Sequence, residues 1–181
     1  MGEREKGILT ALLSKPISRV DYVLGKFLGT LVTVTLVMLA MGGLHFLVMK
    51  LSGIAFSSKF FWAVYLSVLE AAVIISVMSF FSSFSTPILG SFFTLCVFVS
   101  GSLSKDLLAF AERFGGTAFK ALATGGYYVL PNLALFNVRQ EAVHDLPLQD
   151  GFIYSVTIYG IFYSLFMLML ASLIFRRKDI R

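Results

Sequence analysis

The chain consists of long apolar runs separated by short polar segments. Membrane-spanning helices are predicted over residues 27–49, 60–84, 87–104 and 152–175. A hydrocarbon core about 30 Å thick needs about 20 apolar residues of helix, so the third run, with 18 residues, is marginal. The pattern predicts an all-α, polytopic membrane helix bundle, with about four transmembrane helices in one domain, residues 27–175.

The first 26 residues have a different, amphipathic pattern. Their apolar positions have helical spacing and form one stripe, which consists of Ile8, Leu9, Leu12 and Leu13. Pro16 ends this helix, because the residue before a proline is pushed out of the helical region. Ser18, with Asp21 three residues later, is a capping signal that starts a new helix. The pattern predicts two helices that meet at an elbow, and an interfacial helix lying on lipid fits it equally well.

Residues 105–150 mix charged and apolar positions between the third and fourth predicted spans. An apolar stripe along one helical face begins this segment, at Leu107, Leu108, Phe110, Ala111 and Phe114. Glycine pairs at 115–116 and 125–126 then interrupt the pattern. We expect an external segment here, either a surface helix or a re-entrant one.

Composition and charge support a membrane protein and orient it. Hydrophobic residues make up 57% of the chain and charged residues 14%, well below the roughly 25% of soluble domains. Nine Lys and Arg fall on the side of the two termini, the basic tail 176–181 included, and six on the other side. The positive-inside rule therefore predicts a multi-pass protein of the plasma or inner membrane with both termini in the cytoplasm. Because the net charge of +5 lies at membrane boundaries, it indicates contact with lipid and not with nucleic acid.

The sequence lacks the motifs of several enzyme classes. No G-x-x-x-x-G-K-[ST] loop occurs that could cradle nucleotide phosphates, and no zinc-protease or serine-hydrolase motif is present. Cys96 is the only cysteine, so an intrachain disulfide and a cysteine-based metal site are excluded. We expect no catalytic residues, no metal site and no cofactor bound by this chain.

Glu70 is the only charged residue in the second predicted span. A carboxylate at the middle of a bilayer costs at least ~2.5 kcal/mol, so it normally faces protein or a wet cavity. Ser67 lies one turn earlier on the same face and could hydrogen-bond it. The pair is a candidate for the lining of a translocation path, with a hydrogen-bonded structural carboxyl as the equal alternative. His45 is a weaker candidate partner, expected nearer the outer surface.

Gly25 and Gly29 form a small-x-x-x-small pair at the start of the first predicted span. Such a pair permits close approach of a neighbouring helix, although it is frequent by chance. We expect helix packing at these two glycines.

Residues 3–26 resemble the cytoplasmic coupling segment of the type-2 ATP-binding-cassette (ABC) exporter permeases. The positions that match its pattern are Glu3, Arg4, Gly7, Leu12, Leu13, Pro16, Arg19, Gly25 and Lys26. The F-R-R-K-D ending, residues 175–179, and the segment before the last span are similar as well. The resemblance covers essentially the whole chain. Permeases of this type usually have two further spans before the coupling segment, and this sequence does not contain them.

The resemblance implies a permease subunit that couples ATP hydrolysis by a separate subunit to export. Residues 1–26 would then be a coupling helix and elbow, with a docking surface formed by Glu3, Arg4, Gly7, Leu9, Leu12, Leu13, Pro16 and Arg19. The implied partners are an ABC ATPase, which carries the ATP and Mg, and a second permease copy, as homodimer or heterodimer. Two other functions stay open, a non-transporting membrane scaffold or assembly factor and a small channel that uses Glu70. The substrate is not indicated.

Overall fold

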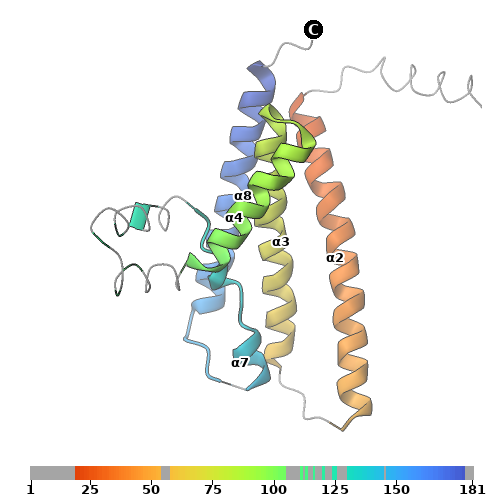
Figure 1. Cartoon of the computed structure of the whole chain (residues 1–181). Helices are drawn as coiled ribbons and strands as arrows, with labels where there is room; N and C mark the ends of the chain where they lie inside the picture. Colours follow the sequence, from red (N-terminus) through yellow and green to blue (C-terminus); the bar gives the residue numbers. More distant parts are fainter. Residues whose placement is uncertain are drawn as a thin grey trace, which may run out of the picture.

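The computed structural model is a bundle of long helices (Figure 1). It describes residues 19–53, 58–104, 111, 113, 116, 120, 124–125, 130–144 and 146–177. Within these ranges the chain is helical apart from turns and short connections. The predicted all-α membrane helix bundle is confirmed.

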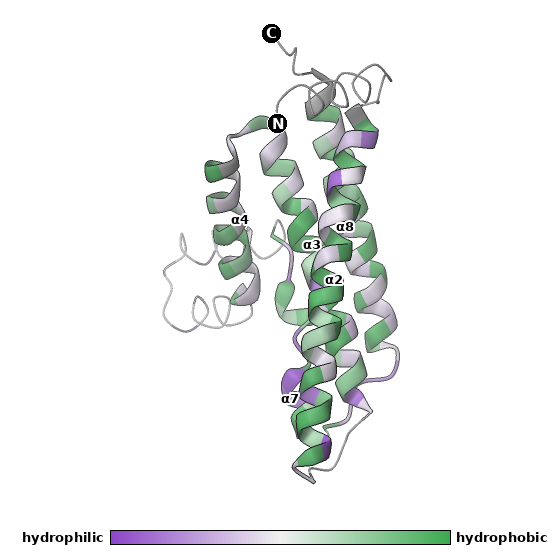
Figure 2. Ribbon diagram, turned by 90° about the vertical axis from the view of Figure 1, so that its right-hand side faces the viewer, coloured by the Kyte–Doolittle hydropathy of each residue, from purple (hydrophilic) through white to green (hydrophobic). Residues whose placement is uncertain are grey.

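Three of the described helices are long and apolar enough to cross a membrane. They are α2 (Arg19–Leu51), α3 (Lys59–Phe84) and α8 (Phe152–Arg177). Each follows from an almost uncharged run, in which only intrahelical hydrogen bonds satisfy the backbone inside lipid. In the view of Figure 2, apolar residues predominate along these helices, and hydrophilic residues lie at α7 (Arg139–Val143) and near the helix ends. This distribution fits a bundle whose outer faces contact lipid.

Helix α3 is the centre of the bundle and packs against α2, α4 and α8. Toward the end where α3 finishes, Val23 and Phe27 of α2 contact Ala72 and Ile75 of α3, together with α8. Toward its beginning, a second apolar cluster joins α3 and α8 to residues 133–138. By contrast, most of α2 is exposed on its other faces. The fold therefore has a packed pair, α3 and α8, with α2 attached along one stripe.

Helix α4 (Pro87–Ser102) is shorter than the third predicted span, residues 87–104. Thr86 has an extended backbone and Pro87 lies in the first turn, which makes a tight connection from α3. Its 16 residues give about 24 Å of helix, less than the roughly 30 Å of a hydrocarbon core. The third predicted span, marginal in length at residues 87–104, is in the structure a helix that ends at Ser102. Pro131 and Leu133 lie against Gly101 near this end.

Beyond the end of α4, the bundle is continued by residues 131–143, about thirty positions later in the sequence. This segment contains a 3-10 turn, η1 (Leu133–Leu135), followed by α7. Its side chains Leu133, Phe136 and Val138 are at most 3% exposed and belong to the core around α3 and α8. Apart from Ala111, Arg113 and the other single residues described, residues 105–129 lie outside the described part of the chain, including most of the expected stripe. The structure therefore describes mainly the second half of the expected external segment, from residue 130 onward, and part of that half is buried.

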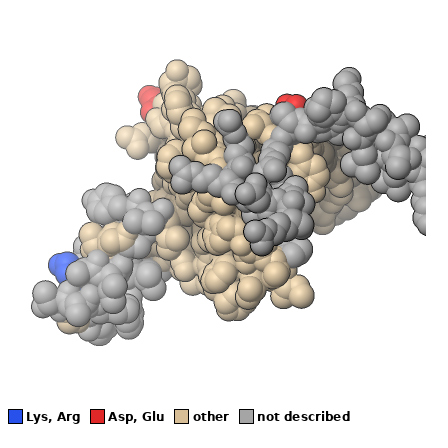
Figure 3. Space-filling model, turned by 90° about the horizontal axis from the view of Figure 1, so that it is seen from above, with Lys and Arg blue, Asp and Glu red and all other residues tan. Residues whose placement is uncertain are grey.

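The beginning of α2 and the end of α8 lie at the same end of the bundle (Figure 1). The end of α2, the start of α3 and the start of α8 lie toward the opposite end (Figure 1). Figure 3 looks down onto the first of these ends, where the described surface is mostly uncharged with acidic side chains at its edge. The basic side chains expected at this end, apart from Lys26, lie outside the described residues or their side chains are not described.

Candidate functional site: a polar cavity beneath helix α4

The predicted coupling residues are mostly outside the described part of the chain. These residues are Glu3, Arg4, Gly7, Leu9, Leu12, Leu13 and Pro16. Arg19 is the first residue of α2, so the helix begins where the Ser18 and Asp21 signal places it. The expected docking surface stays a prediction.

The predicted helix-packing glycines face open space within this chain. A Cβ atom at Gly25 or at Gly29 would meet nothing within 4 Å. The close approach of α2 to α3 is instead at Gly42, where a Cβ would lie 3.3 Å from the Val64 side chain. The described residues therefore show no helix packed against the earlier pair, and packing there stays a prediction.

A polar cavity of about 550 Å³ lies where α4 ends against α3 and α7. Its lining residues are Glu70, Phe98, Ser102, Leu133, Ala134, Asn137, Arg139, Gln140 and Glu141. Glu70 is eleven residues into α3, about 16 Å along the helix from its start at Lys59. The cavity is therefore deep within the length of a spanning helix, at a level where charged groups are rare.

Two glycines and one asparagine position the walls of this cavity. A Cβ on Gly101 of α4 would lie 2.5 Å from the Pro131 carbonyl oxygen, so only glycine fits against that backbone. A Cβ on Gly160 of α8 would lie 2.9 Å from the Leu69 side chain and 3.1 Å from the Phe136 ring. Asn132 is buried. Its side-chain oxygen accepts a hydrogen bond from the Ser104 hydroxyl at 3.0 Å, and its backbone N–H donates to the Tyr159 hydroxyl at 2.9 Å. Non-helical backbone is thus anchored at this depth by polar partners.

Glu141 has an unsatisfied carboxylate oxygen. Its Oε2 atom is enclosed and has no hydrogen-bond partner among the described residues. Glu70 and Arg139 line the same cavity from α3 and from the start of α7. One carboxylate from α3, together with a carboxylate and a guanidinium from α7, therefore lines one polar space.

Ser67 and Glu70 line different cavities. Ser67 lines an apolar groove of about 540 Å³ between α2, α3 and α7, and Arg139 lines both this groove and the polar cavity. His45 lines the same groove and stacks on Phe60, with ring centroids 5.6 Å apart. Phe60 precedes Glu70 by ten residues, or about 15 Å of helix, so His45 lies too far out to pair with Glu70.

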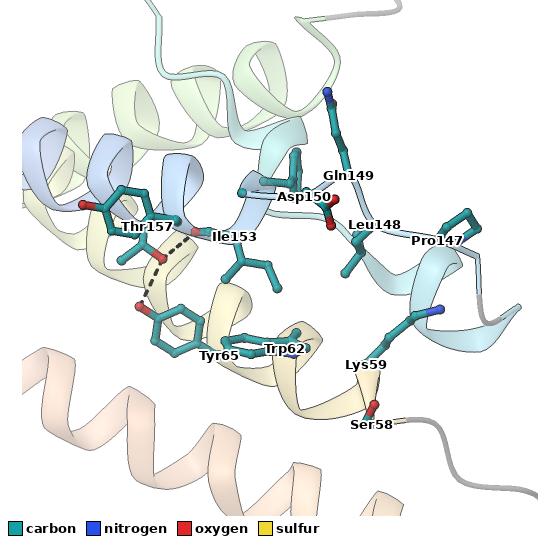
Figure 4. Close-up of a pocket in the computed structure, with 13 residues that line it drawn as sticks. Ser58, Lys59, Trp62, Tyr65, Pro147, Leu148, Gln149, Asp150, Ile153 and Thr157 are labelled. Atoms are coloured by element: carbon teal, nitrogen blue, oxygen red, sulfur yellow. Dashed lines mark hydrogen bonds between the residues drawn. The ribbon is translucent and has the colours of Figure 1, made fainter.

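A third, wider cavity of about 840 Å³ lies at the start of α3 and α8 (Figure 4). Trp62 and Tyr65 form one wall with their rings nearly perpendicular, and the Tyr65 hydroxyl is 3.2 Å from the Thr157 hydroxyl. Lys59 and Asp150 also line it. Amphipathic aromatic residues at the end of a spanning helix fit the interfacial position expected for them.

Sequence reasoning missed Asn132, Arg139 and Glu141. Asn132 directly precedes the largely apolar run 133–138, and Arg139 and Glu141 follow it. A charged pair directly after such a run is the signal that could have identified a buried polar wall. Its partner Glu70, 69 positions before Arg139, could not be found from local pattern.

Comparison with known proteins gives one match. A sequence model of a family described as ABC-2 family transporter protein matches residues 1–180. No curated protein and no solved structure gave a significant match.

Proposed function

We propose that this chain, which belongs to the ABC-2 family of transporter proteins, couples ATP hydrolysis by a separate subunit to export of a substrate. Membership of the family makes the chain a membrane permease component of an ABC transporter. The observation that carries this proposal is the family match over residues 1–180, nearly the whole chain. The permease family is a membrane component and not itself an ATPase. ATP and Mg would therefore be bound by the partner.

The proposed coupling runs through the start of α2. The leucine stripe Leu9, Leu12 and Leu13 docks on the ATPase, and the elbow at Pro16 joins that helix to α2. Val23 and Phe27, in the first turns of α2, are 7% and 8% exposed because they pack on α3 and α8. A displacement at Arg19 would consequently press directly on the central helix pair, since well-packed side chains transmit strain.

The proposed substrate path includes the polar cavity, with Glu70 as a lining group. Irregular backbone next to a short helix is tolerated at membrane depth where it borders a cavity, and transporters place their binding sites at such breaks. Ser67 lines the neighbouring groove, which shares Arg139 with this cavity. Both predicted residues thus retain a place in the proposed path, on two sides of Arg139.

The proposed assembly is a second permease copy beside this one, with an ABC ATPase on the cytoplasmic side and lipid around the apolar faces. A Cβ at Gly25 or Gly29 would meet nothing within 4 Å among the described residues, which leaves room for the second copy at this face. The membrane location follows from the family and the apolar helices. We propose a multi-pass arrangement in the plasma or inner membrane, with both termini in the cytoplasm.

Docking is tested with a paired substitution, Leu12→Asp with Leu13→Asp. We expect it to abolish co-purification of an ABC ATPase, identified by mass spectrometry of its nucleotide-binding peptide, while membrane insertion persists. The matched control is Thr10→Asp with Ser14→Asp, which adds the same charge on the opposite face of the predicted helix. Equal recovery of the ATPase with both double variants would refute docking through the leucine stripe.

A further inference from the structure

The cavity beneath α4 has a chemistry that selects its ligand. We propose that it binds the ammonium group of an amphiphilic organic cation, which makes such compounds the substrate class of the transporter. That the bound cation is a transported substrate rests on the proposed function, whereas the binding site itself is argued from the cavity alone. Its lining combines carboxylates, amides and a few apolar side chains in about 550 Å³.

The balance of polar groups favours a cation. Glu70 and Glu141 contribute two carboxylates, and Arg139 is the only basic side chain among the described residues that line the cavity. Ionised carboxylates accept hydrogen bonds and donate none. The enclosed Glu141 Oε2 atom lacks a donor among the described residues, and an ammonium group carries three.

The end of α4 adds to this preference. Ser102, the last residue of that helix, lines the cavity. The C-terminal end of a helix carries partial negative charge on its free carbonyl groups, which favours nearby cations. The charge of the side chains and the helix end therefore act in the same direction.

The size and the apolar lining indicate an organic cation and not a bare metal ion. No group of three or more His, Cys, Asp or Glu side chains that could hold a metal ion occurs among the described residues, and two carboxylates line the cavity. Its volume is within the range of about 300 to 1,000 Å³ that is typical of sites for small molecules. Phe98 and Leu133 offer apolar contacts for a hydrocarbon portion beside the charged group.

The experiment uses the full chain in lipid nanodiscs and two fluorescent probes. Dansylcadaverine carries a primary amine that is charged at neutral pH, and its N-acetyl derivative has nearly the same size without the charge. We expect the amine to bind at least tenfold more tightly than the acetylated probe in a fluorescence titration. Equal binding of the two probes would overturn the inference without any variant.

Three substitutions locate the site and separate charge from structure. Glu70→Gln and Glu141→Gln should each weaken amine binding about tenfold and leave the acetylated probe unchanged. Arg139→Gln should tighten amine binding several-fold, because it removes the opposing charge, and a merely structural effect would not do so. Asp150→Asn is the matched control, because Asp150 lines the outer cavity, the wider one of about 840 Å³ at the start of α3 and α8. It should change the binding of neither probe.

The outcomes distinguish this inference from the proposed function. Loss of amine binding in Asp150→Asn but not in Glu70→Gln would move the site to the outer cavity and refute the inference. Weaker amine binding in Arg139→Gln would also refute the charge argument. If the ATPase co-purifies but the amine does not bind, the transporter function stands and the substrate class fails. Amine binding that depends on Glu70 without any ATPase would instead support the site and contradict the coupled function.

Discussion

At the scale of single residues, the irregular segment beneath α4 depends on a few hydrogen bonds. Residues 131 and 132 lie at membrane depth outside any regular helix, where water is scarce. The Tyr159 hydroxyl accepts the Asn132 N–H, and the Ser104 hydroxyl donates to the Asn132 side chain. Tyr159 also packs against Phe136, with ring centroids 6.1 Å apart. Tyr159 thus accepts a backbone hydrogen bond from Asn132 and packs against Phe136 in the same irregular segment.

Tyr159→Phe tests the hydrogen bond and leaves the ring in place. The Asn132 N–H would lose its acceptor, and an unsatisfied buried donor costs about 1–3 kcal/mol. We expect the thermal midpoint of the purified protein to fall by several degrees, measured by intrinsic fluorescence. Tyr154→Phe is the matched control, because Tyr154 is 72% exposed. Equal midpoints for the two variants would show that the Tyr159 hydroxyl contributes nothing.

At the scale of elements, α4 and the segment 131–143 together occupy the position of one spanning helix. The sequence predicts α2, α3 and α8 well, because each is an apolar run with very few charges. It predicts α4 only as a marginal span, because what ends this helix is a contact with Pro131, thirty positions after Gly101. The polar cavity lined by Arg139 and Glu141 could not be predicted for the same reason, because its third charged group, Glu70, belongs to another helix. Local pattern encodes the helices, and contacts between distant residues determine the cavity.

Gly101→Ala tests the junction between these two elements. The new methyl group would lie 2.5 Å from the Pro131 carbonyl oxygen, so one of the two elements must shift. We expect a loss of about 1–3 kcal/mol, as for other overpacked sites, and a lower thermal midpoint. Gly43→Ala is the control, because a Cβ there meets nothing within 4 Å. A Gly101→Ala variant as stable as the control would mean that α4 is not held against this backbone.

At the scale of the whole molecule, α3 and α8 form a closely packed central pair, and α2 lies at the periphery of the bundle. Helix α3 is in contact with α2, α4 and α8, whereas α2 is held mainly by a stripe near its beginning. In the remaining length of α2, the described contact with α3 is around Gly42 and His45. Movement of α2 relative to α3 would change the groove that contains Ser67 and Arg139. This geometry connects the proposed coupling end to the polar cavity through two helices.

The direction of each helix makes the proposed orientation testable. Helix α3 runs opposite to α2, and α8 runs parallel to α3 (Figure 1). Residues 52 and 149 therefore share one end of the bundle, and residue 86 lies at the other. In a background with Cys96→Ser, which removes the only cysteine, Ser52→Cys and Gln149→Cys should react with a membrane-impermeant maleimide in right-side-out vesicles. Thr86→Cys should react only after permeabilisation, which also serves as the control for all three. Labelling of Thr86→Cys in sealed vesicles would place the proposed coupling end outside the cell, where no ATP-driven subunit could reach it, and would contradict the proposed function.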